Sequence, residues 1–371
     1  MKTRAIMLAL LGLTAGFVLG EDAPKTVVEP RASTLVSQQF EADFEALVAD
    51  DIQLLQGGLA YGQKHGRFEW TASLAYQTFA LDYRPAPFDF LGADRALEEG
   101  RIAAQANGRF RWGESVSLLG STGVYDGFAN YRSVWLNEYF RQQFSTLPEY
   151  VPASPRGENV AAGVRWEYLP ASAFVEGTVS YLHDEIAPGY EIDFAGLRRD
   201  RHHLDTLAYQ LAFENVLSRR VRVRNEFRLT DTTERELRCA YQGSLNVALG
   251  ERWVARLFGG YTEEAPTFGA HYYGGALDFE PAAGWTVGVF GRRYVDSGEI
   301  ENSLFSSAAP GLSAWQAGLS LRRSWGVHSF RLAAAPYQTR FEPAGIGTAF
   351  FQNLYRGRDW ALVQLAYAAD F

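Results

Sequence analysis

The chain is poor in lysine and cysteine. Its lysines are Lys2, Lys25 and Lys64, so almost all of its 35 basic residues are arginines. The planar guanidinium of arginine binds carboxylates and phosphates through a fork of hydrogen bonds. Cys239 is the single cysteine, so no disulfide within the chain can hold the fold, and we expect a structural thiol there.

The motifs of cofactor and nucleotide sites are missing as well. The sequence has no Cys/His spacing typical of metal sites, no glycine-rich phosphate loop and no nucleophile elbow. Acidic residues outnumber basic ones, 43 to 35, whereas nucleic-acid-binding proteins usually carry a basic patch. We therefore expect no cofactor, no bound metal, no nucleic-acid partner and no enzyme.

Long apolar runs are confined to the N-terminus. Lys2 and Arg4 precede a mostly apolar segment, 5–18, which leads into a small-residue cleavage site. Beyond it, no stretch reaches the 18 apolar residues typical of a membrane-spanning helix. The pattern predicts a secretory signal peptide over residues 1–20, cut after Gly20. The alternative is an N-terminal anchor that is retained.

The rest of the chain consists of segments that alternate between apolar and polar residues. Over 237–249 the odd positions carry Leu, Cys, Tyr, Gly and Val, and the even ones carry Arg, Ala, Gln, Ser and Asn. Successive side chains of a strand point to opposite faces, whereas a helix would place Gly243 in its interior at a cost of ~1 kcal/mol. The pattern predicts strands, at 36–48, 52–63, 68–83, 99–112, 115–126, 159–169, 172–183, 205–217, 220–231, 236–249, 252–263, 268–280, 285–296, 312–324, 328–340 and 358–371.

The connections between these strands are sorted by length. Tight ones include 113–114, 170–171, 218–219, 250–251, 282–284 and 325–327. They alternate with longer ones at 84–98, 127–158, 184–204, 297–311 and 341–357, although two on the long side, near 232–235 and 264–267, are also short. One end of the sheet therefore carries turns and the other mostly loops, as in membrane barrels.

Aromatic residues lie near both ends of the strands. Tyrosine and tryptophan favour a membrane interface because the ring is apolar while its OH or NH group stays hydrated. Two rows at the strand ends predict the aromatic girdles of a membrane barrel. The first row lies beside the tight turns and the second near the opposite ends: Trp112, Tyr168, Trp253, Trp285 and Trp325, then Tyr83, Tyr181, Tyr261, Tyr273 and Tyr294.

The last segment ends on an aromatic residue. Phe371, Ala369, Tyr367, Leu365 and Val363 share one parity. With the signal peptide, the alternating strands and the sorted loops, this terminus resembles bacterial outer-membrane β-barrel proteins, over nearly the whole mature chain. The resemblance implies that Phe371, Tyr367, Leu365 and Val363 are the signal read by the barrel-assembly machinery, with Ala369 smaller than the residue usual there.

The bilayer and the resemblance together predict one fold. Each backbone group left unpaired in hydrocarbon costs several kcal/mol, so a spanning sheet must close on itself. We expect an all-β, closed antiparallel up-and-down transmembrane β-barrel over residues 36–371, with 16 strands (14 is the alternative), after a flexible periplasmic segment at 21–35. The expected location is the outer membrane of a Gram-negative-type envelope. The expected partners are the lipid bilayer, lipopolysaccharide, small solutes and, by analogy with porins, further copies of the chain.

Sixteen strands enclose a water-filled lumen. On the polar parity, arginines outnumber the acids Glu167, Glu176, Glu214, Glu226, Asp278 and Asp370, and rings of arginine select anions in other pores. The layout resembles that of porins, which implies a passive diffusion channel for small hydrophilic solutes, and the arginines predict that this channel has a weak anion preference. It also implies a third loop, 127–158, that folds inwards; a surface flap is the alternative. The pore-lining candidates are Arg101, Arg109, Arg111, Arg165, Arg222, Arg224, Arg228, Arg238, Arg256, Arg292, Arg322 and Arg331. For any one arginine, pairing with acids of the wall is the alternative role.

Histidines and acids at the rim of the predicted barrel allow a different function. His183 to Glu185 end one predicted strand, and 198–205, which holds His202 and His203, leads into the next. These residues suffice for a base with an orienting acid or for a metal site, although a serine nucleophile with matching spacing is missing. A solvated loop, or a rim that binds lipopolysaccharide through divalent ions, is the simpler interpretation. A rim-located hydrolase competes with the channel, as does a structural or surface-interaction barrel with 127–158, 184–204 and 341–357 as its contact surface.

Overall fold

The described part of the chain consists of strands. The computed structural model describes residues 37–83, 95–127, 156–170, 172–185, 189–193, 196–200, 203–233, 235–266, 268–298, 310–342 and 356–371. None of these residues belongs to a helix long and apolar enough to cross a membrane. The predicted signal peptide, 1–20, and the segment 21–35 lie outside the described residues.

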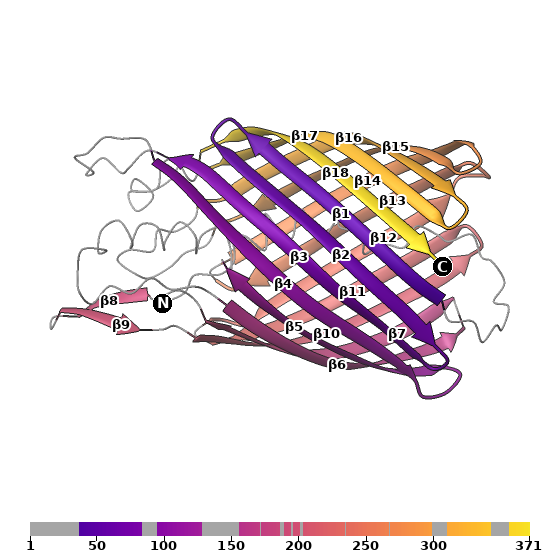
Figure 1. Ribbon diagram of the computed structural model, residues 1–371, viewed down its shortest axis with the longest axis horizontal. Helices are drawn as coiled ribbons and strands as arrows, with labels where there is room; N and C mark the ends of the chain where they lie inside the picture. The colour runs from indigo at the N-terminus through magenta and orange to yellow at the C-terminus, as the bar shows by residue number, and fades with distance from the viewer. Residues whose placement is uncertain are drawn as a thin grey trace.

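Sixteen of the strands form a closed antiparallel barrel, which confirms the predicted fold (Figure 1). Each strand pairs with its neighbours along the chain, and β7 pairs with β10. The barrel strands are β1 (Ser37–Ala49), β2 (Ile52–His65), β3 (Phe68–Tyr83), β4 (Arg95–Arg111), β5 (Val116–Gly127), β6 (Arg156–Leu169), β7 (Ala173–Glu185), β10 (His203–Ser218), β11 (Val221–Thr232), β12 (Arg238–Ala248), β13 (Trp253–Glu264), β14 (Phe268–Ala282), β15 (Trp285–Asp296), β16 (Leu312–Trp325), β17 (His328–Phe341) and β18 (Arg358–Asp370).

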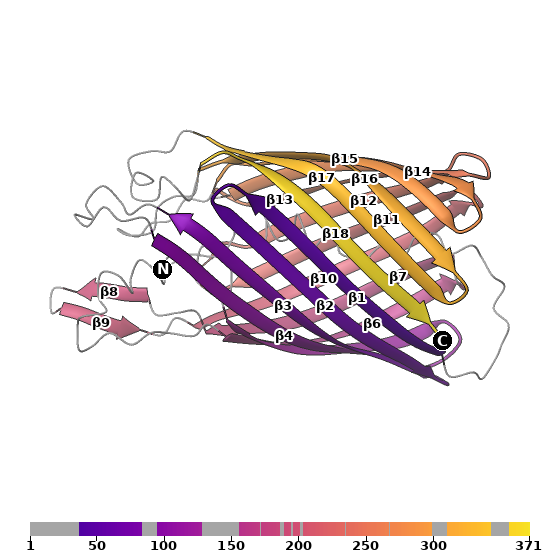
Figure 2. The same ribbon diagram turned by 45° about the horizontal axis from the view of Figure 1, so that its top comes forward.

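The first and last strands close the barrel. In the view of Figure 2, β18 runs beside β1, and Gln39 is the register partner of Asp370. The backbone N–H of Phe371 donates to the carbonyl of Gln38 at 2.8 Å, and the N–H of Gln38 donates back at 3.0 Å. Because this pairing is continuous, the barrel has no free sheet edge.

The two ends of the barrel differ as the sequence predicts. Tight connections such as 66–67 and 326–327 gather at one end, here called the turn end, together with Phe371. Gly66 and Gly326 adopt φ values of 58° and 56° in these turns, a left-handed conformation that glycine takes without steric cost. The opposite, loop end carries the longer connections, and the tight β1–β2 turn at 50–51 also lies there.

One connection contains strands that the sequence pattern does not predict. Within 184–204, predicted as a loop, β8 (Gly189–Asp193) pairs with β9 (Gly196–Asp200) in a small hairpin of its own. Figure 1 shows this hairpin beyond the loop end of the barrel. The loop 127–158, predicted to fold inwards, lies outside the described residues for nearly all of its length.

Apolar side chains cover the outside of the barrel. On β16, for example, Leu319 and Leu321 are 64% and 39% exposed, and every barrel strand presents one such parity to its surroundings. All five aromatic residues predicted beside the turns are exposed, as are Tyr181, Tyr261 and Tyr273 towards the loop end. The assignment of Tyr294 to this girdle is wrong, because it lies on the opposite parity of β15 and is only 6% exposed. The side chain of Tyr83 lies outside the described part.

Apolar residues also gather inside the barrel towards the loop end. Leu47, Phe79 and Leu81 are each 1% exposed and lie on the inward parity of β1 and β3. They belong to a cluster that extends over eight neighbouring strands, β14–β18 and β1–β3. One part of the inner wall is therefore apolar, which a uniformly hydrophilic lumen would not show.

Candidate functional site: the inner wall of the barrel

The inner wall is built by the residues between the exposed apolar ones. Side chains of a strand alternate between its two faces. Arg322 has the opposite parity on β16 to Leu319 and Leu321, which are exposed on the outside, so Arg322 faces inwards. The same comparison on each strand places the predicted arginines on the inward parity, although a role in conduction stays a prediction: Arg101, Arg109, Arg111, Arg165, Arg222, Arg224, Arg228, Arg238, Arg256, Arg292, Arg322 and Arg331.

More acids share this parity than the sequence pattern alone identifies. Glu41, Asp43 and Glu45 alternate along β1, opposite to the exposed Phe44 and Val48. The inward acids Asp184, Glu264 and Asp296 are buried near the loop end. Positive charge is therefore in excess only in parts of the wall. The acids that neighbour each arginine determine which parts these are.

From β4 to β11 the inward charges form a ladder of pairs. Arg109 contacts Glu167 at 2.5 Å. Arg165 lies 3.4 Å from Glu167 and 3.7 Å from Glu176. These residues come from strands that are close neighbours in the barrel, so opposite charges alternate across the wall and stabilise it.

The ladder continues on the next two strands. Arg222 lies 3.2 Å from Glu214, and Arg224 lies 3.6 Å from Glu226. Arg228 forms no ion pair in the described part of the chain, and its side chain is exposed to the lumen. The other arginines of the ladder pair with acids of the wall, which is the alternative role that the sequence allows. They are Arg109, Arg165, Arg222 and Arg224.

Two arginines near the loop end are held by other contacts. The guanidinium of Arg101 stacks on the ring of Tyr125 at 4.0 Å, and the Tyr125 hydroxyl donates to Asp184. Arg238 donates to Glu264 through Nε at 2.9 Å and through a terminal nitrogen at 2.6 Å. Both contacts join neighbouring or near-neighbouring strands, so they hold the wall together as well as carrying charge.

A different arrangement occurs on β13, β16 and β17. Arg322 and Arg331 are direct cross-strand partners, and Arg256 approaches them closely enough for its charge to act on both. We call these three residues the arginine cluster. Its carboxylate is Asp278, which forms an ion pair with Arg256. Three positive charges therefore share one negative charge.

A row of amides separates the polar wall from the apolar cluster. Gln364 donates to Glu45 at 2.5 Å, Gln56 donates to the other oxygen of Glu45 at 3.3 Å, and Gln77 donates to Gln56 at 3.0 Å. The next row of inward side chains lies two positions further along each strand, towards the loop end. It consists of Leu362, Leu47, Leu54 and Phe79. The inner wall thus changes from polar to apolar within one row.

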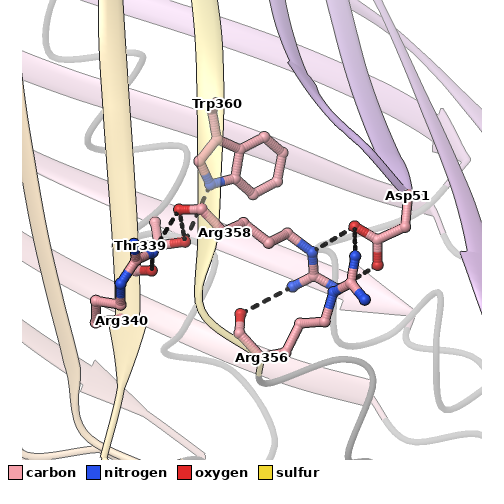
Figure 3. A network of polar contacts seen from close by, with 6 residues as sticks. All are labelled: Asp51, Thr339, Arg340, Arg356, Arg358 and Trp360. Atoms are coloured by element: carbon pink, nitrogen blue, oxygen red, sulfur yellow. Dashed lines mark hydrogen bonds and ion pairs between the residues drawn. The ribbon is translucent and has the colours of Figure 1, made fainter.

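Towards the loop end, an ion pair ties β18 to the β1–β2 turn (Figure 3). Arg358 donates to the two carboxylate oxygens of Asp51 at 2.9 and 3.0 Å, and Arg356 approaches Asp51 at 3.0 Å. Burial would raise the pKa of Asp51, but hydrogen bonds and charge from Arg358 and Arg356 outweigh it and hold that pKa below its ordinary value of 3.8. The Trp360 indole N–H donates to Thr339 in the same network.

The histidine of the predicted rim faces outwards. His183 Nδ1 lies 2.7 Å from an oxygen of Asp205, which also accepts a hydrogen bond from the Tyr181 hydroxyl. Asp184, in contrast, points inwards, so the structure separates it from His183. His202 and the side chain of His203 lie outside the described residues. The described residues contain no group of three His, Cys, Asp or Glu side chains arranged to hold a metal ion.

Comparisons with known proteins place the fold. No protein-family model and no curated protein matches the chain. Among solved structures, CdiB from Acinetobacter baumannii superposes with a TM-score of 0.53 at 11% identity, over 90% of this chain and 60% of that one. A bacterial polysaccharide outer membrane secretin superposes with a TM-score of 0.50 at 8% identity, over 91% and 99% of the two chains. The chain thus spans about three-fifths of the length of CdiB and nearly all of the secretin.

Likeness at such low identity shows the fold alone. The outside of the barrel adds a physical argument, because a closed sheet with an apolar outer belt and aromatic residues at both ends is the form in which strands span a membrane. The chain is therefore a 16-strand β-barrel with the fold of bacterial outer-membrane proteins, and its location is the outer membrane.

Proposed function

We propose that the barrel is a passive diffusion channel for small hydrophilic solutes with a weak anion preference. The observation that carries the proposal is the inner wall towards the turn end, where charged and amide side chains from nearly every strand face inwards. A barrel that served only as a structural element would not need to keep so many charges on that face, since each charge costs free energy unless it is hydrated or paired.

The anion preference rests on the arginine cluster. Along the ladder from β4 to β11, most arginines lie next to an acid, and their fields largely cancel. At the arginine cluster the fields of the arginines do not cancel. Among the described residues, Asp278 is the one carboxylate that acts on all three of them. A local excess of positive charge raises the concentration of anions at that point of the passage.

The remaining features of the proposal concern the surroundings of the barrel. We propose that residues 1–20 are removed as a signal peptide and that 21–35 is a periplasmic segment. Phe371, Tyr367, Leu365 and Val363 would be read by the barrel-assembly machinery, and the outward rim near His183 would face lipopolysaccharide. A homo-oligomer, by analogy with porins, belongs to the same set of proposals.

The test is reconstitution of the purified barrel into a planar lipid bilayer. We expect stepwise conductance and, across a salt gradient, a reversal potential whose sign shows that anions permeate better than cations. Insertion without any steps would contradict the channel and favour a structural or surface-interaction barrel.

The rim hydrolase is tested separately through His183, because its contact with Asp205 is the arrangement of a base with an orienting acid. The variant His183→Ala should leave the conductance unchanged, since this side chain faces away from the lumen. Hydrolysis of a lipid or ester by the wild-type barrel that disappears in His183→Ala would instead assign an enzyme to the rim.

A further inference from the structure

The arginine cluster has an electrostatic arrangement unlike the rest of the described wall. We propose that Arg256, Arg322 and Arg331 form a binding site for a small oxyanion, such as phosphate or a carboxylate, on the inner wall. The proposal deepens the proposed channel function, since the site would lie on the path of the solute, but its binding can be measured without conductance.

The register brings two of the arginines face to face. Arg322 on β16 is the direct cross-strand partner of Arg331 on β17. Side chains on one face at such positions have Cβ atoms about 4.5–5.5 Å apart, so the two guanidinium groups occupy the same part of the wall. Like charges at directly opposite positions destabilise a sheet.

In the part of the chain that the structure describes, carboxylates balance only part of the charge of the cluster. Asp278 acts on all three arginines, but it is bound to Arg256 in an ion pair. Arg322 and Arg331 form no ion pair with any residue that the structure describes. Asp43 lies on the same row as Arg331, with Ala366 between them, but it forms no ion pair with either arginine in the described part of the chain. Among the described residues, the cluster therefore holds two more positive charges than negative ones.

Burial makes this arrangement more costly than elsewhere on the wall. Arg111 and Arg228 also form no ion pair in the described ranges, but their side chains are exposed, whereas those of Arg322 and Arg331 are half-buried. In addition, Arg256 Nε is buried and has no hydrogen-bond partner among the described residues. Partly buried charges are screened less by salt and water, so their repulsion persists unless an anion binds between them.

The chemistry of the groups identifies the class of anion. A guanidinium group offers donors in a planar fork that matches two oxygens of a carboxylate or phosphate. Thr286, the cross-strand partner of Arg322, places a hydroxyl donor on the same row. A monatomic anion such as chloride cannot use the fork in this way, so the site should discriminate oxyanions from chloride.

Competition in a planar bilayer tests the site. With potassium chloride as the electrolyte, added potassium phosphate or acetate should lower the chloride conductance in a saturable way. In the variant Arg322→Ala/Arg331→Ala, half-block should need at least about tenfold more phosphate, which is the effect expected for losing one charge-assisted hydrogen bond or more. The control Arg111→Ala/Arg228→Ala removes the same charge from the wall and should keep the wild-type affinity.

A second measurement keeps the site separate from the channel. In detergent, phosphate should raise the unfolding temperature of the wild type and of Arg111→Ala/Arg228→Ala, but not that of Arg322→Ala/Arg331→Ala. This result without any conductance would support the site and contradict the channel. No effect of phosphate or acetate on the wild type in either measurement, or equal effects on both double variants, would overturn the site.

Discussion

At the residue scale, the contact between Asp51 and Arg358 joins parts of the chain that are 307 positions apart. The side chains are 13% and 3% exposed, so the arginine has little access to water. A buried charge that loses its partner is strongly destabilising because its desolvation is no longer compensated. This pair therefore contributes to the closure of the barrel at the β1–β18 seam.

We expect Asp51→Asn to weaken the seam at neutral pH. The variant keeps the size of the side chain but removes the negative charge that Asp51 places against Arg358. This loss should lower the free energy of unfolding by about 1.5–3 kcal/mol. The temperature at which the folded band disappears on SDS gels should fall accordingly. Asp359→Asn is the control, because the exposed pair that Asp359 forms with Arg340 contributes little.

The same pair gives a pH dependence with a defined sign. The folded-state pKa of Asp51 is lowered, so its contribution is complete above the ordinary value of 3.8 and is lost as the pH falls below that value through the folded pKa. The stability of the wild type should therefore approach that of Asp51→Asn in acid. A difference between the two proteins that stays constant from neutral pH down to strong acid would contradict this account.

The sequence predicts on which face of the sheet a residue lies, but it does not predict which residues that side chain contacts. Alternation assigns Arg322 and Arg331 to the inward face because parity is a local property. It cannot show that the two are register partners, which depends on the lengths of both strands and their turn. It also cannot find the contact of Asp51 with Arg358, since no local pattern links the turn after the first strand to the last strand.

At the element scale, each strand separates a lipid face from a lumen face. Ala104 and Gln105 on β4 illustrate this separation. Ala104 lies between its cross-strand partners Leu74 and Val124, which are 47% and 56% exposed. Gln105 points the other way and donates to Asn107. The two positions are adjacent and near the middle of the strand, so they differ mainly in the face that they occupy.

An arginine should be tolerated at one of these positions only. On the lipid face near the bilayer midplane it costs about 2–4 kcal/mol, so Ala104→Arg should lower the yield of folded barrel and its unfolding temperature. Gln105→Arg places the same group in the lumen and should fold like the wild type. Equal stability of the two variants in lipid would show that β4 has no lipid face.

The strands themselves are predictable to within a few residues at most ends, because a long run of alternation is a strong signal. The hairpin of β8 and β9 is not, since each strand has five residues and pairs only with the other. The prediction for Tyr294 fails because an aromatic residue near a strand end fits a girdle, whereas its parity on β15 places it among the buried residues of the inner cluster.

At the scale of the whole molecule, the inner wall is divided along the barrel. Charged and amide residues occupy it towards the turn end. Towards the loop end, an apolar cluster occupies eight adjacent strands, while charged pairs such as Arg238 and Glu264 continue on the other strands. The sequence predicts a polar wall because arginines and glutamines stand out on the inward parity. It does not predict the apolar part, since residues such as Leu47 and Phe79 would fit the outer face of a barrel equally well.

Hydrocarbon should cover the outside of the barrel, and water should fill the polar part of its inside. Site-directed spin labels on β12, in a Cys239→Ala background, measure both at once. Labels at 241 and 245 should collide with oxygen dissolved in the lipid, and labels at 242, 244 and 246 with a water-soluble nickel complex. Alternation with a period of two residues is the predicted result. Equal access of the nickel complex to both sets, or its access to neither, would contradict the account.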